Sequence, residues 1–245
     1  MKCPFRAHVE RVSAAKAGTG ARMNGQGLAP AEHGAGASEY RLLLAALGND
    51  LRQLSNTQSL ERKIEIKRGL FDRYRDWVDG ALSAEQPAQD EILGTMLVWS
   101  IDIGDWPRAM AIAEHVLRHG LTLPERYKRT AGTLIAEEVA EAGLTLPSTV
   151  DLATLQRVEA LTAATDMPDQ VRAKLKKATG LAFKAAAEAF DPNAESGVAG
   201  GKPALIRAAI TQFERALALN STCGVKKLIA QLERELAQAA SEKAE

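Results

Sequence analysis

Hydrophobic residues recur at the spacing of an α-helix along almost the whole chain from Ser38 onward. A first stretch begins at Ser38, and a longer one begins after Ser59, a residue type that favours helix N-caps. Each stretch gathers its apolar side chains on one helical face, so the two together predict a helical hairpin over residues 38–82. The residues that form these stripes are Leu42, Leu43, Leu47, Leu51, Leu54, Leu60, Ile64, Ile66, Leu70, Phe71, Tyr74, Trp77 and Val78.

Further helical patterns follow, and most have a proline near their start. Proline is tolerated in the first turn because its missing N–H needs no partner there; Pro124, for example, predicts a helix over 124–142. No convincing alternation of apolar and polar residues indicates a strand, so the predicted fold class is all-α. The expected helices after the hairpin cover residues 89–103, 107–119, 124–142, 150–162, 168–190, 204–219 and 222–240.

Two segments resemble the second helix of a tetratricopeptide unit. One is Gly104-Asp105-Trp106 with the small residues that follow it, and the other runs from Ala204 to Asn220. Neither copy is complete, and a solenoid normally needs at least three repeats. We therefore predict local αα-hairpin packing of the tetratricopeptide kind and no repeat array.

Composition divides the chain further. Residues 17–37 are rich in Gly and Ala with almost no large apolar groups, so they cannot bury enough surface to offset the entropy of ordering. We expect a flexible basic arm and linker over 1–37, the hairpin over 38–82 and a helical core over 83–190. A linker over 191–203 and C-terminal helices over 204–245 complete the prediction.

The formal net charge is zero, but its distribution is uneven. Residues 1–75 hold 13 Lys/Arg against 7 Asp/Glu, residues 76–165 hold 6 against 14, and residues 166–245 hold 12 against 10. A basic first third beside an acidic middle suits a polyanion binder, although chance asymmetry on a solvated surface gives the same pattern.

Three groups of cations are candidates for contacts with DNA phosphates. On the long helix Lys63 and Lys67 share a face, although Glu61, Glu65 and Asp72 are interleaved and can pair with them instead. Aromatic residues for base stacking are not interleaved, which argues against single-strand recognition. The candidates are Lys2, Arg6, Arg11, Lys16 and Arg22 on the arm, Arg62, Lys63, Lys67 and Arg68 on the helix, and Arg126, Lys128 and Arg129 further on.

Signals for catalysis are weak. Residues 197–202, GVAGGK, superficially resemble a phosphate-binding loop, but its spacing is short by one residue and Pro203 stands where a Ser or Thr would hold magnesium. His115 and His119 have no evident third metal ligand. Asp102 and Asp105 form the nearest carboxylate pair, yet a turn entering a helix needs an acceptor cap anyway. We predict no metal, no cofactor and no catalytic residue.

The three tryptophans, Trp77, Trp99 and Trp106, fall at helix ends or near turns. Such residues most often lie in the core, and the alternative is that they form an oligomer interface. Cys3 and Cys223 are too few for a disulfide framework or a metal cluster, which indicates a reducing cytoplasm. No apolar run reaches 18 residues and the N-terminus lacks a secretory signal, so no membrane association is expected.

The stretch from Glu91 to Thr130, EILGTMLVWSIDIGDWPRAMAIAEHVLRHGLTLPERYKRT, resembles the GpM-type small terminase subunit of temperate contractile-tailed phages. Members carry a similar V-W-x-I-D-x-G-D block and a similar R-H-G-x-x-x-P-x-R-Y-K-R-T block. The similarity covers most of residues 38–190, with weaker matches near the N-terminus and from Met167.

The resemblance implies a subunit that recognises viral cohesive-end (cos) DNA and presents it to the large terminase subunit, which supplies ATP hydrolysis and cutting. Such subunits generally assemble as rings, so the resemblance implies a homo-oligomer. It also implies that the protein acts in the cytoplasm of the infected bacterial host. The C-terminal helices beyond residue 204 are the candidate contact with the large subunit. GpM-type proteins are also described as the endonuclease subunit, so a metal-dependent nuclease is an alternative, as is an adaptor that binds only protein.

Overall fold

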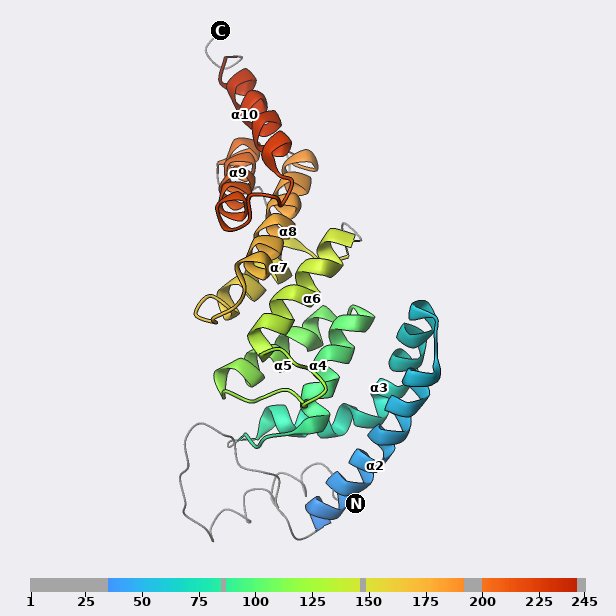
Figure 1. Ribbon diagram of the computed structural model, residues 1–245. Coiled ribbons are helices and arrows are strands. Elements are labelled where there is room, and N and C mark those ends of the chain that lie inside the picture. The colour runs from blue at the N-terminus through green and yellow to red at the C-terminus, as the bar shows by residue number, and fades with distance from the viewer. Residues whose placement is uncertain (1–34, 85–86, 146–148, 192–199, 242–245) are drawn as a thin grey trace. The chain divides into compact units, whose positions relative to one another are not determined.

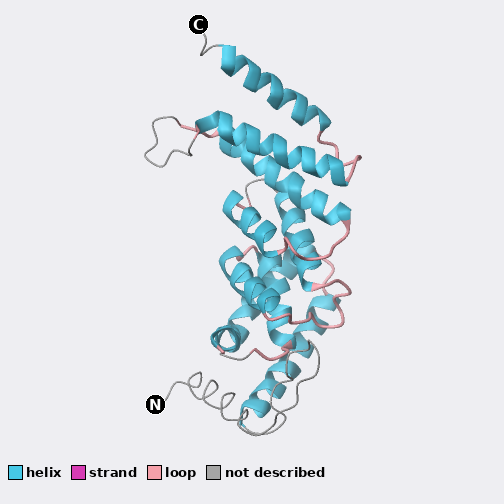
Figure 2. Cartoon of the chain, turned by 90° about the vertical axis from the view of Figure 1, so that its left-hand side faces the viewer, coloured by secondary structure: helices cyan, strands magenta, loops and turns pink. Residues whose placement is uncertain are grey.

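A computed structural model describes residues 35–84, 87–145, 149–191 and 200–241. The chain forms two compact units, Met1–Ala131 and Gly132–Glu245. The finer division into five segments predicted from the sequence stays a prediction. The described residues are helices joined by loops, without a strand (Figure 2), which confirms the predicted all-α class for this part of the chain. None of the described helices is both long enough and apolar enough to span a membrane.

The helices follow one another along the chain in the order labelled in Figure 1. The first unit contains α2 (Ala35–Asn56), α3 (Leu60–Ser83), α4 (Glu91–Ile103) and α5 (Trp106–Arg118). The second contains α6 (Ala131–Thr145), α7 (Leu152–Leu161), α8 (Asp169–Glu188), α9 (Gly201–Leu219) and α10 (Lys226–Ser241).

Helices α2 and α3 run antiparallel as the predicted hairpin (Figure 1). Ser59 caps α3, because its side chain accepts a hydrogen bond from the amide of Arg62. A buried carboxylate ties the two helices together: Asp50 of α2 accepts two hydrogen bonds from Arg73 and one, of 2.5 Å, from the Tyr74 hydroxyl. Burial and the Asp50 bond raise the pKa of Tyr74, so this phenol stays protonated.

A second buried carboxylate, Asp90, fixes the start of α4 against α3. One of its oxygens accepts from the amides of Ile92 and Leu93, and the other accepts from the Trp77 indole at 2.6 Å. Tyr40 of α2 stacks on Trp77 at 5.1 Å between ring centres. Burial, followed by the charge of Asp90, raises the pKa of Tyr40 to about 12.

Helices α4 and α5 meet at the predicted Gly-Asp turn. Asp105 caps α5 by accepting from the amide of Arg108, which confirms that this carboxylate serves as a helix cap. The Arg108 guanidinium lies over the Phe71 ring and bonds Asp79 at 2.9 Å, so it joins α5 to α3.

One predicted boundary is wrong. The helix expected over 124–142 begins only at Ala131, and residues 119–130 form a loop. The amide of Tyr127 bonds the carbonyl of Pro124 in a turn, and Pro124 itself is buried against Gly94 of α4. This tertiary contact overrides the helical start that the proline suggested.

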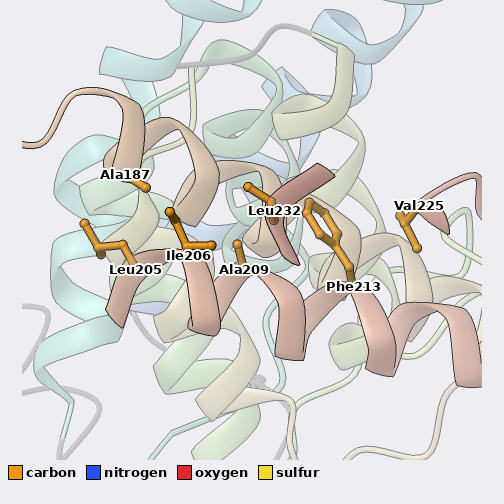
Figure 3. Close-up of a cluster of buried hydrophobic side chains, with 7 residues drawn as sticks. All are labelled: Ala187, Leu205, Ile206, Ala209, Phe213, Val225 and Leu232. Atoms are coloured by element: carbon orange, nitrogen blue, oxygen red, sulfur yellow. The ribbon is translucent and has the colours of Figure 1, made fainter. Parts of the chain in front are cut away.

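One core cluster of the second unit lies between α8, α9 and α10. Phe213 is fully buried there and lies so close to α8 that a Cβ on Gly180 would stand 2.5 Å from its ring. Only glycine allows this approach, and overpacking it would cost stability. The cluster, drawn in Figure 3, consists of Ala187, Leu205, Ile206, Ala209, Phe213, Val225 and Leu232.

Candidate nucleic-acid interface

Four predicted cations lie within two turns of α3, and two of them hold the end of α4. The Lys67 ammonium pairs with Asp102, and the Arg68 guanidinium donates to the carbonyl of Ile103 at 3.2 Å. A helix C-terminus carries partial negative charge, so cations are favoured there. These two residues therefore place the start of α3 against the last turn of α4.

The other two α3 cations, Arg62 and Lys63, have their charges free. Arg62 is exposed and Lys63 is half-buried, and neither side chain forms an ion pair within the described part of the chain. Glu61 and Glu65 are exposed on the same helix. The start of α3 therefore carries both basic and acidic side chains.

The second group of cations lies on the loop of residues 119–130, which packs on α4. The Gln89 amide pairs with both backbone groups of Thr122, at 2.5 and 2.9 Å. Pro124 occupies the space left by the missing side chain of Gly94. The loop is thus held at two points before its basic residues begin.

Arg126 holds the loop at a third point. Its guanidinium bonds Glu91 at 2.7 Å and also bonds the Thr95 hydroxyl, while it lies 5.2 Å from the Tyr127 ring centre. Burial raises the pKa of Tyr127, and the charges of Asp102 and Glu91 add to this effect.

The structure brings the helix cluster and the loop cluster to neighbouring parts of α4. Arg126 binds at Thr95 and Lys67 binds at Asp102, seven residues further along the helix. Seven residues are about two turns, so both lie on one side of α4 roughly 10 Å apart. We use the name basic face for the cations of these two segments, which are Arg62, Lys63, Lys67 and Arg68 of α3 and Arg126, Lys128 and Arg129 of the loop.

Lys128 and Arg129 are exposed on the loop. Arg129 has an interaction of its own, whereas Lys128 forms no ion pair with any described residue. The basic face thus combines cations that hold the structure with cations that are free to meet a ligand. The predicted arm residues Lys2, Arg6, Arg11, Lys16 and Arg22 lie outside the described residues.

The residues that position the loop were not singled out from the sequence. Gln89, Glu91 and Thr95 are polar side chains on a mostly buried helix and its entry. Glu91 and Thr95 are four residues apart, so they share a face. That pair is the one local signal of a polar partner for Arg126.

The predicted interface tryptophans lie at different depths. Trp99 is 1% exposed and packs edge-on to Tyr74, and Trp77 is engaged by Asp90 and Tyr40. Trp106 is half-buried, so it has the most surface to offer a second copy. An oligomer role for these residues stays a prediction.

The candidate catalytic groups have structural partners. Asp102 binds Lys67, and Asp105 caps α5. His115 is buried beside His119, with ring centres 4.7 Å apart, and burial lowers the pKa of His115. In the described part of the chain no three His, Cys, Asp or Glu side chains gather as metal ligands would. The first half of the GVAGGK segment, residues 197–199, lies outside the described residues, and its Lys202 pairs with Glu235.

The model of the phage small terminase subunit family matches residues 44–170, just over half of the chain, so the chain belongs to that family. The chain is also 38% identical to the "Terminase, endonuclease subunit" of Escherichia phage P2, over 96% of this chain and 86% of that protein. It is 26% identical to the "Probable terminase, endonuclease subunit" of Haemophilus phage HP1, over 45% of this chain and 39% of that one. No solved structure matches significantly. The family supports a role in phage DNA packaging.

Proposed function

We propose that this chain recognises viral cos DNA and delivers it to the large terminase subunit for genome packaging in the host cytoplasm. The basic face carries this proposal. It combines cations of α3 with cations of the 119–130 loop, two segments that both contact α4, and Arg62, Lys63 and Lys128 form no ion pair with a described residue. Phosphate contacts of this kind supply non-specific affinity and orient a protein on the duplex.

A ring of identical chains completes the proposal. Three free cations are few for a DNA-binding surface, and cyclic symmetry repeats them once per subunit. Mass in solution tests the assembly: we expect a closed oligomer at micromolar concentration, and a strict monomer would contradict it. The large subunit is the proposed partner of α9 and α10 in residues 204–245.

The DNA contact is tested with a charge-matched pair of variants. Lys63→Gln with Lys128→Gln removes two free cations of the basic face, and Arg207→Gln with Arg234→Gln removes two exposed cations of the second unit. Binding to cos-containing duplex is measured over a range of salt concentrations. The first variant should weaken binding and reduce the salt slope by about one for each lost phosphate contact, whereas the second should change neither. Equal effects of both variants on DNA binding would show that the basic face is not the DNA-binding site.

An endonuclease activity is the second candidate, because both relatives are named as endonuclease subunits. A nuclease needs converging carboxylates around metal ions, and Asp102 and Asp105 are the nearest acidic pair. Purified chain with magnesium or manganese and cos DNA, without the large subunit, separates the two candidates. Cleavage that disappears in Asp102→Asn or Asp105→Asn would replace our proposal. Absence of both cleavage and DNA binding would favour an adaptor that binds only protein.

A further inference from the structure

A cavity opens in the second unit where α7, α8 and α9 come together. Its volume is about 390 Å³, and helices α8 and α9, which form much of its wall, lie side by side (Figure 1). Three lining residues are cations and one is an anion, so the wall carries a formal charge of +2. The lining residues are Glu159, Ala163, Arg172, Leu175, Lys176 and Arg215.

The single carboxylate in this wall is already fully engaged. One oxygen of Glu159 accepts from the Thr179 hydroxyl at 2.8 Å. The other accepts from Lys176 at 2.9 Å and from Gln212 at 3.3 Å. Glu159 therefore balances the charge of Lys176 and leaves the two arginines uncompensated.

The two arginines approach the cavity from different helices. Arg172 of α8 donates one hydrogen bond to the carbonyl of Thr165 at 2.6 Å, which holds its guanidinium without neutralising it. Arg215 of α9 is exposed, and its guanidinium has no hydrogen bond or ion pair to any described residue. Leu175 and Ala163 add an apolar part to the wall.

We propose that this cavity is a binding site for a phosphomonoester, held by Arg172 and Arg215 with Lys176 beside them. A phosphomonoester carries a charge of about −1.5 to −2 at pH 7, which matches the charge of the wall. One guanidinium group can donate two parallel hydrogen bonds to two oxygens of the same phosphate. The volume lies in the range of small-molecule sites. A phosphate with its sugar fits this volume.

Two sources offer this chemistry: a free nucleotide and the 5′-phosphate at a DNA end. The second source rests on the proposed DNA function, and the first is independent of it. An acidic peptide has the same sign of charge but carries it as carboxylates of one charge each, so it fits the wall less well.

Inorganic phosphate is the probe for the site itself. Its binding to the full chain is followed by broadening of the phosphorus NMR line. Arg172→Gln and Arg215→Gln should each weaken binding by about tenfold or more, because each removes a charge-assisted hydrogen bond. Arg207→Gln is the matched control, since Arg207 is exposed on α9 and does not line the cavity. Arg215 forms no hydrogen bond or ion pair with any described residue, so its variant stays informative even if Arg172→Gln fails to fold.

Two further arms identify the source of the phosphate. If the ligand is a DNA end, a duplex with 5′-phosphates binds more tightly than the same duplex with 5′-hydroxyls, and Arg215→Gln abolishes the difference. If it is a nucleotide, dAMP displaces inorganic phosphate and the state of the duplex end has no effect. The proposal is overturned if Arg207→Gln weakens phosphate binding as much as Arg215→Gln does, or if an oligoglutamate peptide binds while phosphate does not. The double variant Lys63→Gln with Lys128→Gln should leave phosphate binding intact. A failure of the proposed DNA function can therefore be told apart from a failure of the phosphate site.

Discussion

The hydrogen bond from Trp77 to Asp90 joins α3 to the start of α4, and Asp90→Asn tests its contribution to stability. Asparagine caps a helix as well as aspartate does, so the amides of Ile92 and Leu93 keep their acceptor. Its amide nitrogen then faces the indole N–H, donor against donor, inside the core. Burial raises the pKa of Asp90, so the figure for a neutral hydrogen bond applies here. Such a bond contributes about 0.5–1.5 kcal/mol, and a buried group left unpaired costs about 1–3 kcal/mol. We expect the first unit to lose about 2 kcal/mol of its free energy of unfolding.

Trp77→Phe completes a double-mutant cycle. Phenylalanine removes the N–H together with part of the ring, so this variant loses roughly 1–2 kcal/mol through packing and the lost bond. In the double variant no indole N–H faces the new amide, and the donor conflict is gone. The double variant should therefore be less destabilised than the sum of the two single ones by about 1 kcal/mol, within the range found for contacting residues.

Urea denaturation followed by tryptophan fluorescence measures these changes. All three tryptophans belong to the first unit, so the signal reports on that unit, and Trp99 and Trp106 remain in the Trp77→Phe variant. Asp105→Asn is the matched control, because Asp105 also caps a helix but has no indole partner. It should change stability by no more than about 0.5 kcal/mol. Additive single effects, or an Asp90→Asn variant as stable as the control, would refute the reasoning.

Two further predictions concern the loop and pH. Gly94→Ala places a Cβ 2.7 Å from Pro124, so the 119–130 loop should shift and the affinity for duplex DNA should fall. Gly69→Ala on α3 is the control, because a Cβ there meets open space. It should leave DNA binding unchanged and stabilise the helix by up to about 1 kcal/mol. Burial, then the charges of His119 and Arg118, lowers the pKa of His115, so the unfolded chain binds more protons and stability should fall as pH drops below about 6.5. Urea titrations from pH 7 to pH 5 should show a smaller loss for His115→Gln, and an unchanged loss would contradict the assignment.

The helices and their first residues could be predicted from the sequence wherever the signal is local. Ser59 and Asp105 cap helices as their chemistry suggests, and the apolar stripes of the hairpin face inward at Phe71 and Tyr74. Residues 124–130 show where this reasoning stops. Their course depends on Gly94 and Glu91, which are some thirty residues away in sequence and which no local pattern connects to the loop.

The cations of the basic face were named from sequence, but their partners were not. Spacing along α3 predicts its interleaved acids as the partners, yet Lys67 pairs with Asp102 of α4, and Asp72 pairs with Arg75. Spacing along one helix shows which side chains share a face, and it does not show which second helix lies against that face. The cavity around Arg172 and Arg215 was missed for the same reason, because three helices have to meet to form it.

The division of the basic face into bound and free cations bears on the proposed ring. Lys67, Arg68 and Arg126 hold α3, α4 and the loop in place. They therefore add to the positive electrostatic potential of the surface but keep their internal partners and do not bind a phosphate directly. If the three free cations, Arg62, Lys63 and Lys128, each meet one phosphate, a single chain gives a salt slope of only about −2.7. Contacts so few give weak binding at physiological salt, whereas adjacent copies on one duplex add their contacts at high effective concentration. The salt slope of the assembled protein should therefore exceed that of a single chain by a factor set by the copies in contact.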